Sequence, residues 1–169
     1  MNPTTFLNVA IRPTLRWMGE PFDNALAERM LLAIAMQESD MEHRHQVGGP
    51  AHGFFQFEPI GCAEAIRIDG LKQTRFFERL ALPTQYDELH VALEWSEAAM
   101  VVCARLILWS ITRPLPGPHE QADAWRQYIR AWKPGKPHPD RWPANWALAC
   151  EACEAVDGVP VETSDGGWW

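Results

Sequence analysis

The side chains best suited to chemistry gather in one short stretch, residues 36–59, which reads MQESDMEHRHQVGGPAHGFFQFEP. Glu38 comes at the end of an apolar segment. The carbonyl groups of a last helical turn and nearby methionine or phenylalanine side chains would there favour a neutral carboxyl group. A carboxylic acid that keeps its proton near neutral pH can act as a general acid. We therefore expect Glu38 to be catalytic, and the alternative is a solvated glutamate at a helix end.

The second half of this stretch pairs aromatic residues with one amide. The chain turns back at Gly48-Gly49-Pro50, Gly53 permits a close backbone approach, and three phenylalanines then surround Gln56. Aromatic faces can stack on sugar rings, and an amide can bond to hydroxyl or N-acetyl groups. This pattern favours a polysaccharide groove in which Gln56, Phe55 and His52 contact the substrate. A core segment with one exposed glutamine is the competing interpretation.

These two features together resemble the core signature of the soluble lytic transglycosylases, within the goose-type-lysozyme-like superfamily. The residues that carry the resemblance are Glu38, Ser39, Ala51, Gly53, Gln56 and Pro59. The separation of 18 positions from Glu38 to Gln56 is the usual spacing of that family. The GGPAHGFFQFE segment (48–58) and WKPGKPHP (132–139) also resemble segments of short phage and prophage proteins.

The resemblance implies an all-α, lysozyme-like domain that cleaves the glycan strand of peptidoglycan without a cofactor. Glu38 would protonate the glycosidic oxygen and then, as a base, take a proton from the 6-hydroxyl of muramic acid. The product would end in 1,6-anhydromuramic acid. Ser39 would help to orient the site, and Gln56 would contact the sugar or Glu38.

A third motif of the family, Ala-Tyr-Asn, has no clear copy in this sequence. Ala104-Arg105-Leu106 stands at its expected place on the central helix. The missing tyrosine helps to position the catalytic acid in the family. Tyr128 and Arg105 are the candidates to take over that role, and Tyr128 is also a candidate wall of the groove.

Two other functions remain open at this point. A hydrolase would need a second carboxylate, for which Asp40 and Glu58 are the candidates. A non-catalytic virion component could retain the fold without activity and bind other virion proteins.

The histidines suggest a metal site as a further alternative. His43 and His45 form a His-x-His pair, and His52 follows seven residues later, a spacing that could ligate zinc. We expect no metal here and interpret these histidines as polar groove or surface residues. Cys150 and Cys153 lack a second ligand pair, so they predict no zinc site either.

The composition and charge of the chain argue against two classes of binding partner, nucleic acids and membranes. The chain has 169 residues and a formal charge of −7, which argues against nucleic-acid binding. No apolar run is long enough for membrane insertion, and the N-terminus has no signal-peptide pattern. We therefore expect synthesis in the cytoplasm of a bacterial host, association with the virion, and action in the periplasm or cell wall.

Helical periodicity dominates the elements that must position these residues. We expect one domain over residues 1–157, followed by a flexible tail, 158–169. Only residues 39–58 should be irregular or short β structure. The expected helices are 24–37, 60–68, 71–80, a continuous buried helix over 85–111, 119–132 and 143–156.

Overall fold

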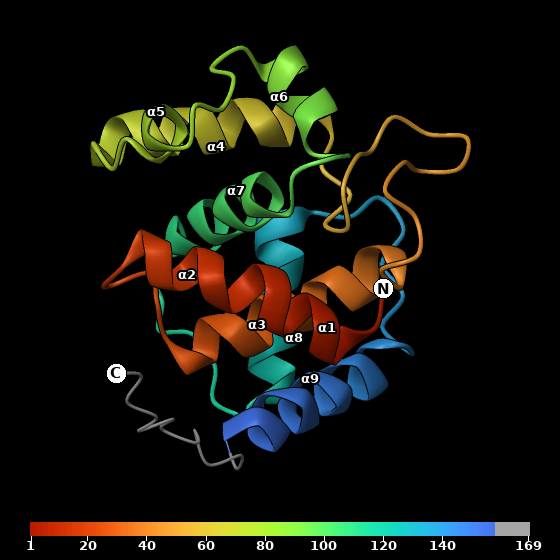
Figure 1. Cartoon of the computed structure of the whole chain (residues 1–169). Coiled ribbons are helices and arrows are strands. Elements are labelled where there is room, and N and C mark those ends of the chain that lie inside the picture. The colour runs from red at the N-terminus through yellow and green to blue at the C-terminus, as the bar shows by residue number, and fades with distance from the viewer. Residues whose placement is uncertain (158–169) are drawn as a thin grey trace, which may run out of the picture.

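Helices account for most of residues 1–157, the part of the chain that the computed structural model describes (Figure 1). That range contains isolated β-bridges but no strand, so the predicted all-α fold is confirmed. The tail predicted over 158–169 lies outside the described residues. In chain order the elements are α1 (Pro3–Phe6), the π-helical turn η1 (Leu7–Ile11), α2 (Arg12–Met18), α3 (Ala25–Ser39), α4 (Pro59–Lys72), α5 (Phe76–Arg79), α6 (Tyr86–Ala92), α7 (Glu97–Trp109), α8 (Gln121–Trp132) and α9 (Trp142–Asp157).

Helix α7 lies at the centre of the molecule. Every residue from Ala99 to Leu108 is buried, as expected for a helix that is apolar on all sides. Helix α4 packs on one side of α7, together with α5 and α6, while η1, α2 and α3 pack on the other (Figure 1). Helix α9 covers the far side of α3. The apolar run 24–37 thus becomes a helix held between two others, with Asn24 as its N-cap.

The predicted continuous helix over 85–111 is wrong. The chain forms α6, leaves the helical path around residues 93–96, and starts again as α7. Ser96 is extended, and its hydroxyl accepts a hydrogen bond from the backbone N–H of Ala99 at 3.2 Å. This N-cap satisfies a donor that a continuing helix would have bonded to its own backbone.

The boundary predicted at Asp69-Gly70 is also wrong, because α4 continues through both residues to Lys72. The buried Asp69 carboxylate instead accepts a hydrogen bond from the N–H of Phe76 at 2.9 Å. It also bonds to the Thr74 hydroxyl. The residue that looked like a helix breaker therefore organises the start of α5.

Two cysteines lie in the buried contact between α4 and α7. The side chains of Cys62 and Cys103 are fully buried. Burial raises the pKa of the Cys62 thiol to about 12 and that of the Cys103 thiol well above its usual range. Both therefore serve as packing groups in the folded protein.

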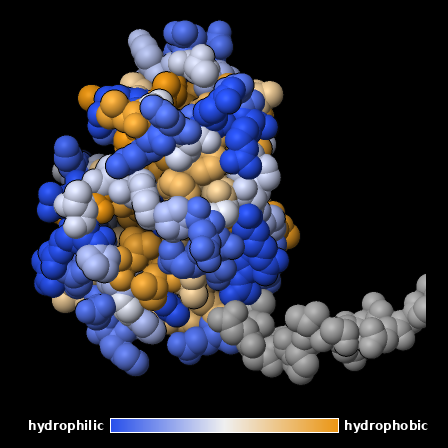
Figure 2. All heavy atoms as spheres, turned by 90° about the vertical axis from the view of Figure 1, so that its left-hand side faces the viewer, coloured by the Kyte–Doolittle hydropathy of each residue, from blue (hydrophilic) through white to orange (hydrophobic). Residues whose placement is uncertain are grey.

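The surface is mixed in polarity. Figure 2 shows apolar side chains in separate groups among polar ones on the face it presents. No helix in residues 1–157 is both long and apolar enough to cross a membrane.

Candidate active site

Glu38 lies in the last turn of α3 and is partly buried. Its carboxyl oxygen Oε1 accepts a hydrogen bond from the Tyr128 hydroxyl at 2.7 Å. Burial raises the pKa of Glu38 to about 7, against the opposing effects of the Tyr128 hydrogen bond and the positive charge of Arg141. Around neutral pH this carboxyl group can therefore both give and take a proton.

Tyr128 is held firmly on α8. Its ring is 2% exposed and stacks on Trp142 of α9, with ring centroids 5.2 Å apart and planes at 10°. Burial, together with the neighbouring Glu38, raises the pKa of Tyr128 well above its usual range. The phenol thus keeps its proton at neutral pH and remains a hydrogen-bond donor to Glu38.

Helix α3 ends immediately after Glu38 because Asp40 adopts a left-handed conformation with φ of 50°. The neighbouring Gln37 fixes the orientation of this end. Its amide donates to the backbone carbonyl of His138 at 3.0 Å, and its side-chain oxygen accepts from Asn145 of α9 at 2.9 Å. The helix that presents Glu38 is therefore anchored on both the 133–141 connector and α9.

Ser39 joins the end of α3 to the returning segment. Its hydroxyl lies 2.8 Å from the carbonyl oxygen of Phe54 and 3.1 Å from that of Ala35, and it accepts from the N–H of Met41 at 3.2 Å. The side chain is buried and pairs with backbone groups only. Its contribution is to hold residue 54 beside the last turn of α3.

The Phe55 ring is fully buried in the core and does not face solvent. Its backbone carbonyl instead accepts a hydrogen bond from the indole N–H of Trp132 at 3.0 Å. Trp132 lies one turn after Tyr128 on α8, so one helix contacts both Glu38 and the returning segment.

Gln56 follows in a left-handed conformation with φ of 48° and is partly buried. Its amide nitrogen donates to the carbonyl of Gly53 at 2.8 Å and lies 3.4 Å from that of His43. In this structure the amide closes the turn of its own loop, and no side-chain hydrogen bond to Glu38 is observed among the described residues.

The two candidate second carboxylates are exposed. Asp40 forms an ion pair with Arg141, whose guanidinium also lies 3.4 Å from the carbonyl of Met36. Glu58 precedes α4 and makes no side-chain capping bond. Within residues 1–157 the structure gives neither carboxylate a hydrogen bond to Glu38 or Tyr128.

Arg105, the other candidate for the missing tyrosine, lies elsewhere. It is 1% exposed and donates to the carbonyl of Phe22 at 2.8 Å and to that of Pro21 at 3.3 Å. Burial lowers its pKa to about 10, so it stays charged at neutral pH. Arg105 holds the segment between α2 and α3, and Tyr128 is the residue that contacts the acid.

His52 is not among the contacts of Glu38. It is buried, stacks on His90, and lies 3.2 Å from a carboxylate oxygen of Glu94. Sequence reasoning missed Glu94, Arg141 and Trp132 as partners of the candidate site residues. Trp132 had a signal, since it opens the WKPGKPHP segment (132–139) that carries part of the sequence resemblance.

Open hollows on the surface of the described chain include two that are lined by tryptophan side chains. One is lined by residues of η1, α2 and the start of α7, including Trp17, and by Trp95 of the preceding turn. The other lies beside the aromatic stack and includes Trp125 and Trp142. Glu38 lines neither of these two hollows. The groups that act on its carboxyl group are the Tyr128 hydroxyl and the Arg141 charge.

Comparison with family models, with curated proteins and with solved structures found no match for this chain.

Proposed function

We propose that this protein cleaves the glycan strand of peptidoglycan as a lytic transglycosylase, with Glu38 as the general acid and base. The observation that carries the proposal is the partly buried Glu38 carboxyl group, whose pKa of about 7 suits it to donate and accept a proton in turn. The resemblance of residues 38–59 to the transglycosylase signature supplies the substrate class.

In the proposed reaction the Glu38 proton passes to the glycosidic oxygen as the bond between that oxygen and C1 of muramic acid breaks. The carbonyl oxygen of the substrate's own N-acetyl group stabilises the positive charge at C1. The 6-hydroxyl then attacks C1, and the Glu38 carboxylate takes its proton. The 1,6-anhydro ring forms without water, and Glu38 regains its starting state.

Tyr128 supplies the positioning role of the tyrosine that the sequence lacks at residue 105. Its hydroxyl bonds to Oε1 of Glu38, and its ring is fixed by the stack on Trp142. A hydrogen bond to a carboxylate stabilises the ionised form, so the tyrosine also keeps the pKa from rising further.

The surroundings of Glu38 favour a transglycosylase over a hydrolase. A hydrolase of the usual type needs a second carboxyl group across the scissile bond. Asp40 is already paired with Arg141, and Glu58 lies at the exposed start of α4. A mechanism that uses a single carboxyl group fits this arrangement best.

The deciding experiment is digestion of purified peptidoglycan by the native protein and by Glu38→Gln, with the products identified by mass. We expect fragments ending in 1,6-anhydromuramic acid from the native protein and none from the variant. Glu151→Gln, an exposed change on α9, is the matched control and should digest normally.

Other outcomes would redirect the proposal. Reducing-end muramic acid from the native protein would mean a hydrolase and return attention to Asp40 and Glu58. No product from a folded native protein would contradict catalysis and favour a virion component that retains only the fold. Delivery by a virion would bring either kind of protein to the cell wall.

A further inference from the structure

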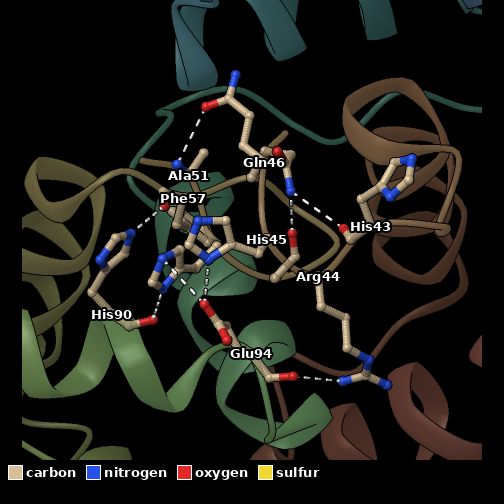
Figure 3. Close-up of polar contacts among 11 residues, drawn as sticks. His43, Arg44, His45, Gln46, Ala51, Phe57, His90 and Glu94 are labelled. Carbon is tan, nitrogen blue, oxygen red and sulfur yellow. Dashed lines mark hydrogen bonds and ion pairs between the residues drawn. The ribbon is translucent and has the colours of Figure 1, made fainter. Parts of the chain in front are cut away.

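Three side chains from two distant segments converge away from Glu38. They are His45 and His52 of the irregular segment and Glu94 of the break between α6 and α7. Figure 3 shows His45 and Glu94 pointing toward each other. The Glu94 oxygen Oε1 lies 2.7 Å from Nδ1 of His45 and 3.2 Å from Nε2 of His52. One ligand atom from each residue lies within 4.8 Å of the other two. No other such group of three His, Cys, Asp or Glu occurs in residues 1–157.

Backbone pairing places the two histidines side by side. His45 and His52 form an antiparallel bridge. It is flanked by hydrogen bonds from the N–H of Gln46 to the carbonyl of Ala51 and from the N–H of Gly53 to that of Arg44, both 2.8 Å. His45 and His52 are thus a non-hydrogen-bonded pair, the register in which opposite side chains come closest on one face.

His52 is oriented as metal-binding histidines usually are. Its Nδ1 lies 2.9 Å from the backbone carbonyl of His90 and donates to it, and its ring stacks on the His90 ring with centroids 3.7 Å apart. Such a bond from one ring nitrogen to a carbonyl fixes the tautomer and leaves the other nitrogen as a ligand. Nε2 of His52, which lies 3.2 Å from the Glu94 oxygen, is the ring nitrogen left to act as a ligand.

Glu94 is also held in place. It sits in the turn before the Ser96 cap, and its backbone carbonyl accepts from the Arg44 guanidinium at 3.1 Å. Arg44 also pairs with Glu97 at the start of α7. Arg44 of the irregular segment therefore binds both the backbone of this turn and the first residue of α7.

We propose that His45, His52 and Glu94 bind a zinc ion, with Nδ1, Nε2 and a carboxylate oxygen as ligands and water in the fourth position. Two imidazoles and one carboxylate are a ligand set that zinc favours. Ligand atoms around a tetrahedral zinc lie roughly 3.3 Å apart, given bond lengths of about 2.0–2.1 Å. The 3.2 Å between Glu94 and His52 is close to that value, and the 2.7 Å between Glu94 and His45 would lengthen when the ion binds. His45 is 58% exposed on its side chain, so water can reach the open position.

Bound zinc would tie the segment that carries Gln56 and Phe57 to the turn between α6 and α7. His52 is the link, since its N–H and carbonyl both pair with Phe57, each at 2.9 Å. The site stands on its own contacts, and none of its ligands contacts Glu38 or Tyr128 in the described chain. The proposed zinc site therefore does not depend on the proposed glycan cleavage.

The test is calorimetric titration of zinc chloride into untagged full-length protein that has been stripped with a chelator. We expect one zinc per chain and a thermal unfolding midpoint that rises with zinc concentration. His45→Ala and Glu94→Gln should each weaken zinc binding by at least about tenfold. Both sites are at least partly exposed, so these variants should fold, and circular dichroism checks that they do.

His43→Ala is the matched control, because this exposed histidine lies two residues before His45 and its ring lies away from Glu94 in Figure 3. It should bind zinc like the native protein, as should Glu38→Gln. Absence of zinc binding by the native chain would overturn the proposal. So would unchanged binding by both His45→Ala and Glu94→Gln. Because Glu38→Gln abolishes only the proposed cleavage, the two proposals can fail separately.

Discussion

The protonation of the Glu38 carboxyl group depends on a balance between burial, which raises its pKa, and the Tyr128 hydrogen bond and Arg141 charge, which lower it. Burial alone would favour the protonated form strongly, and a strongly favoured acid makes a poor base in the second half of a reaction. The Tyr128 hydroxyl offsets part of that effect because it bonds to the carboxylate. The arrangement keeps both protonation states within reach at neutral pH.

Tyr128→Phe tests this interpretation. Loss of the hydroxyl removes a contact that lowers the pKa of Glu38, so that pKa should rise above about 7. The alkaline limb of the pH–rate profile should move to higher pH, since the acid stays protonated longer. The rate at neutral pH should fall about tenfold or more, which corresponds to about 1.4 kcal/mol.

The control for Tyr128→Phe is Tyr86→Phe, the only other tyrosine of the chain, exposed at the start of α6. It should leave both the rate and the profile unchanged. An unshifted profile in a folded, weakly active Tyr128→Phe protein would show that the hydroxyl only fills space.

The candidate acid could be predicted from the sequence because its signal is local. A carboxylate at the end of an apolar helix, followed at fixed spacing by a glycine and a glutamine, lies within two dozen residues. Tyr128 could be named only as one of two candidates, because its contact with Glu38 spans 90 positions. Glu94 carried no local signal, since its partners His45 and His52 lie more than 40 positions earlier.

At the scale of elements, the missed break between α6 and α7 has a physical reason. Leu89, Leu93, Met100 and Cys103 are all buried, and their spacing continues through the break as it would in one helix. Because the buried residues of α6 and α7 keep one helical spacing, the sequence pattern does not reveal the break between the two helices. Ser96 falls on the same spacing within the helix predicted over 85–111, whereas in the structure it is the N-cap of α7.

The irregular segment packs closely against this break. Gly53 has φ of 72°, and a Cβ atom added there would lie 3.0 Å from the carbonyl oxygen of Leu93 and 3.0 Å from the Met100 side chain. The N–H of Phe54 also contacts the Met100 sulfur at 3.2 Å. The loop and the two helices are therefore fitted to each other around this glycine.

Gly53→Ala should destabilise the protein by roughly 2–4 kcal/mol, from the left-handed backbone and the crowding together. Gly48→Ala is the matched control, because Gly48 also has φ of 72° but nothing lies within 4 Å of its added Cβ. It should cost only about 1–2 kcal/mol. Urea unfolding of both variants measures the difference, and equal losses would contradict the close fit.

At the scale of the whole molecule, the unusual pKa of Glu38 makes stability depend on pH. The unfolded chain gives up this proton near the ordinary value of 4.5, whereas the folded chain keeps it until about pH 7. Below pH 4.5 both states hold the proton and the full stability is present. As the pH rises from 4.5 through 7, the folded state loses up to about 3 kcal/mol relative to the unfolded state.

Glu38→Gln should remove this dependence, because an amide does not titrate. The variant should gain stability relative to the native protein as the pH rises from 4.5 to 8, measured as the free energy of unfolding in urea. All other acids are common to both proteins, so the difference between them reports Glu38 alone. If the stability curves of the two proteins run parallel from pH 4.5 to 8, the pKa of Glu38 is not raised in the folded chain.

The buried thiols of Cys62 and Cys103, between α4 and α7, can report how often the contact between these two helices opens. A buried thiol with a raised pKa reacts slowly with alkylating reagents, because the reactive thiolate is absent and the reagent is shut out. Modification of Cys62 or Cys103 can then proceed only when the α4–α7 contact separates. The rate of alkylation at Cys62 and Cys103, resolved from that at Cys150 and Cys153 by peptide mass, thus reports those openings under native conditions. It can be followed in the native sequence as zinc or glycan is added, without any substitution.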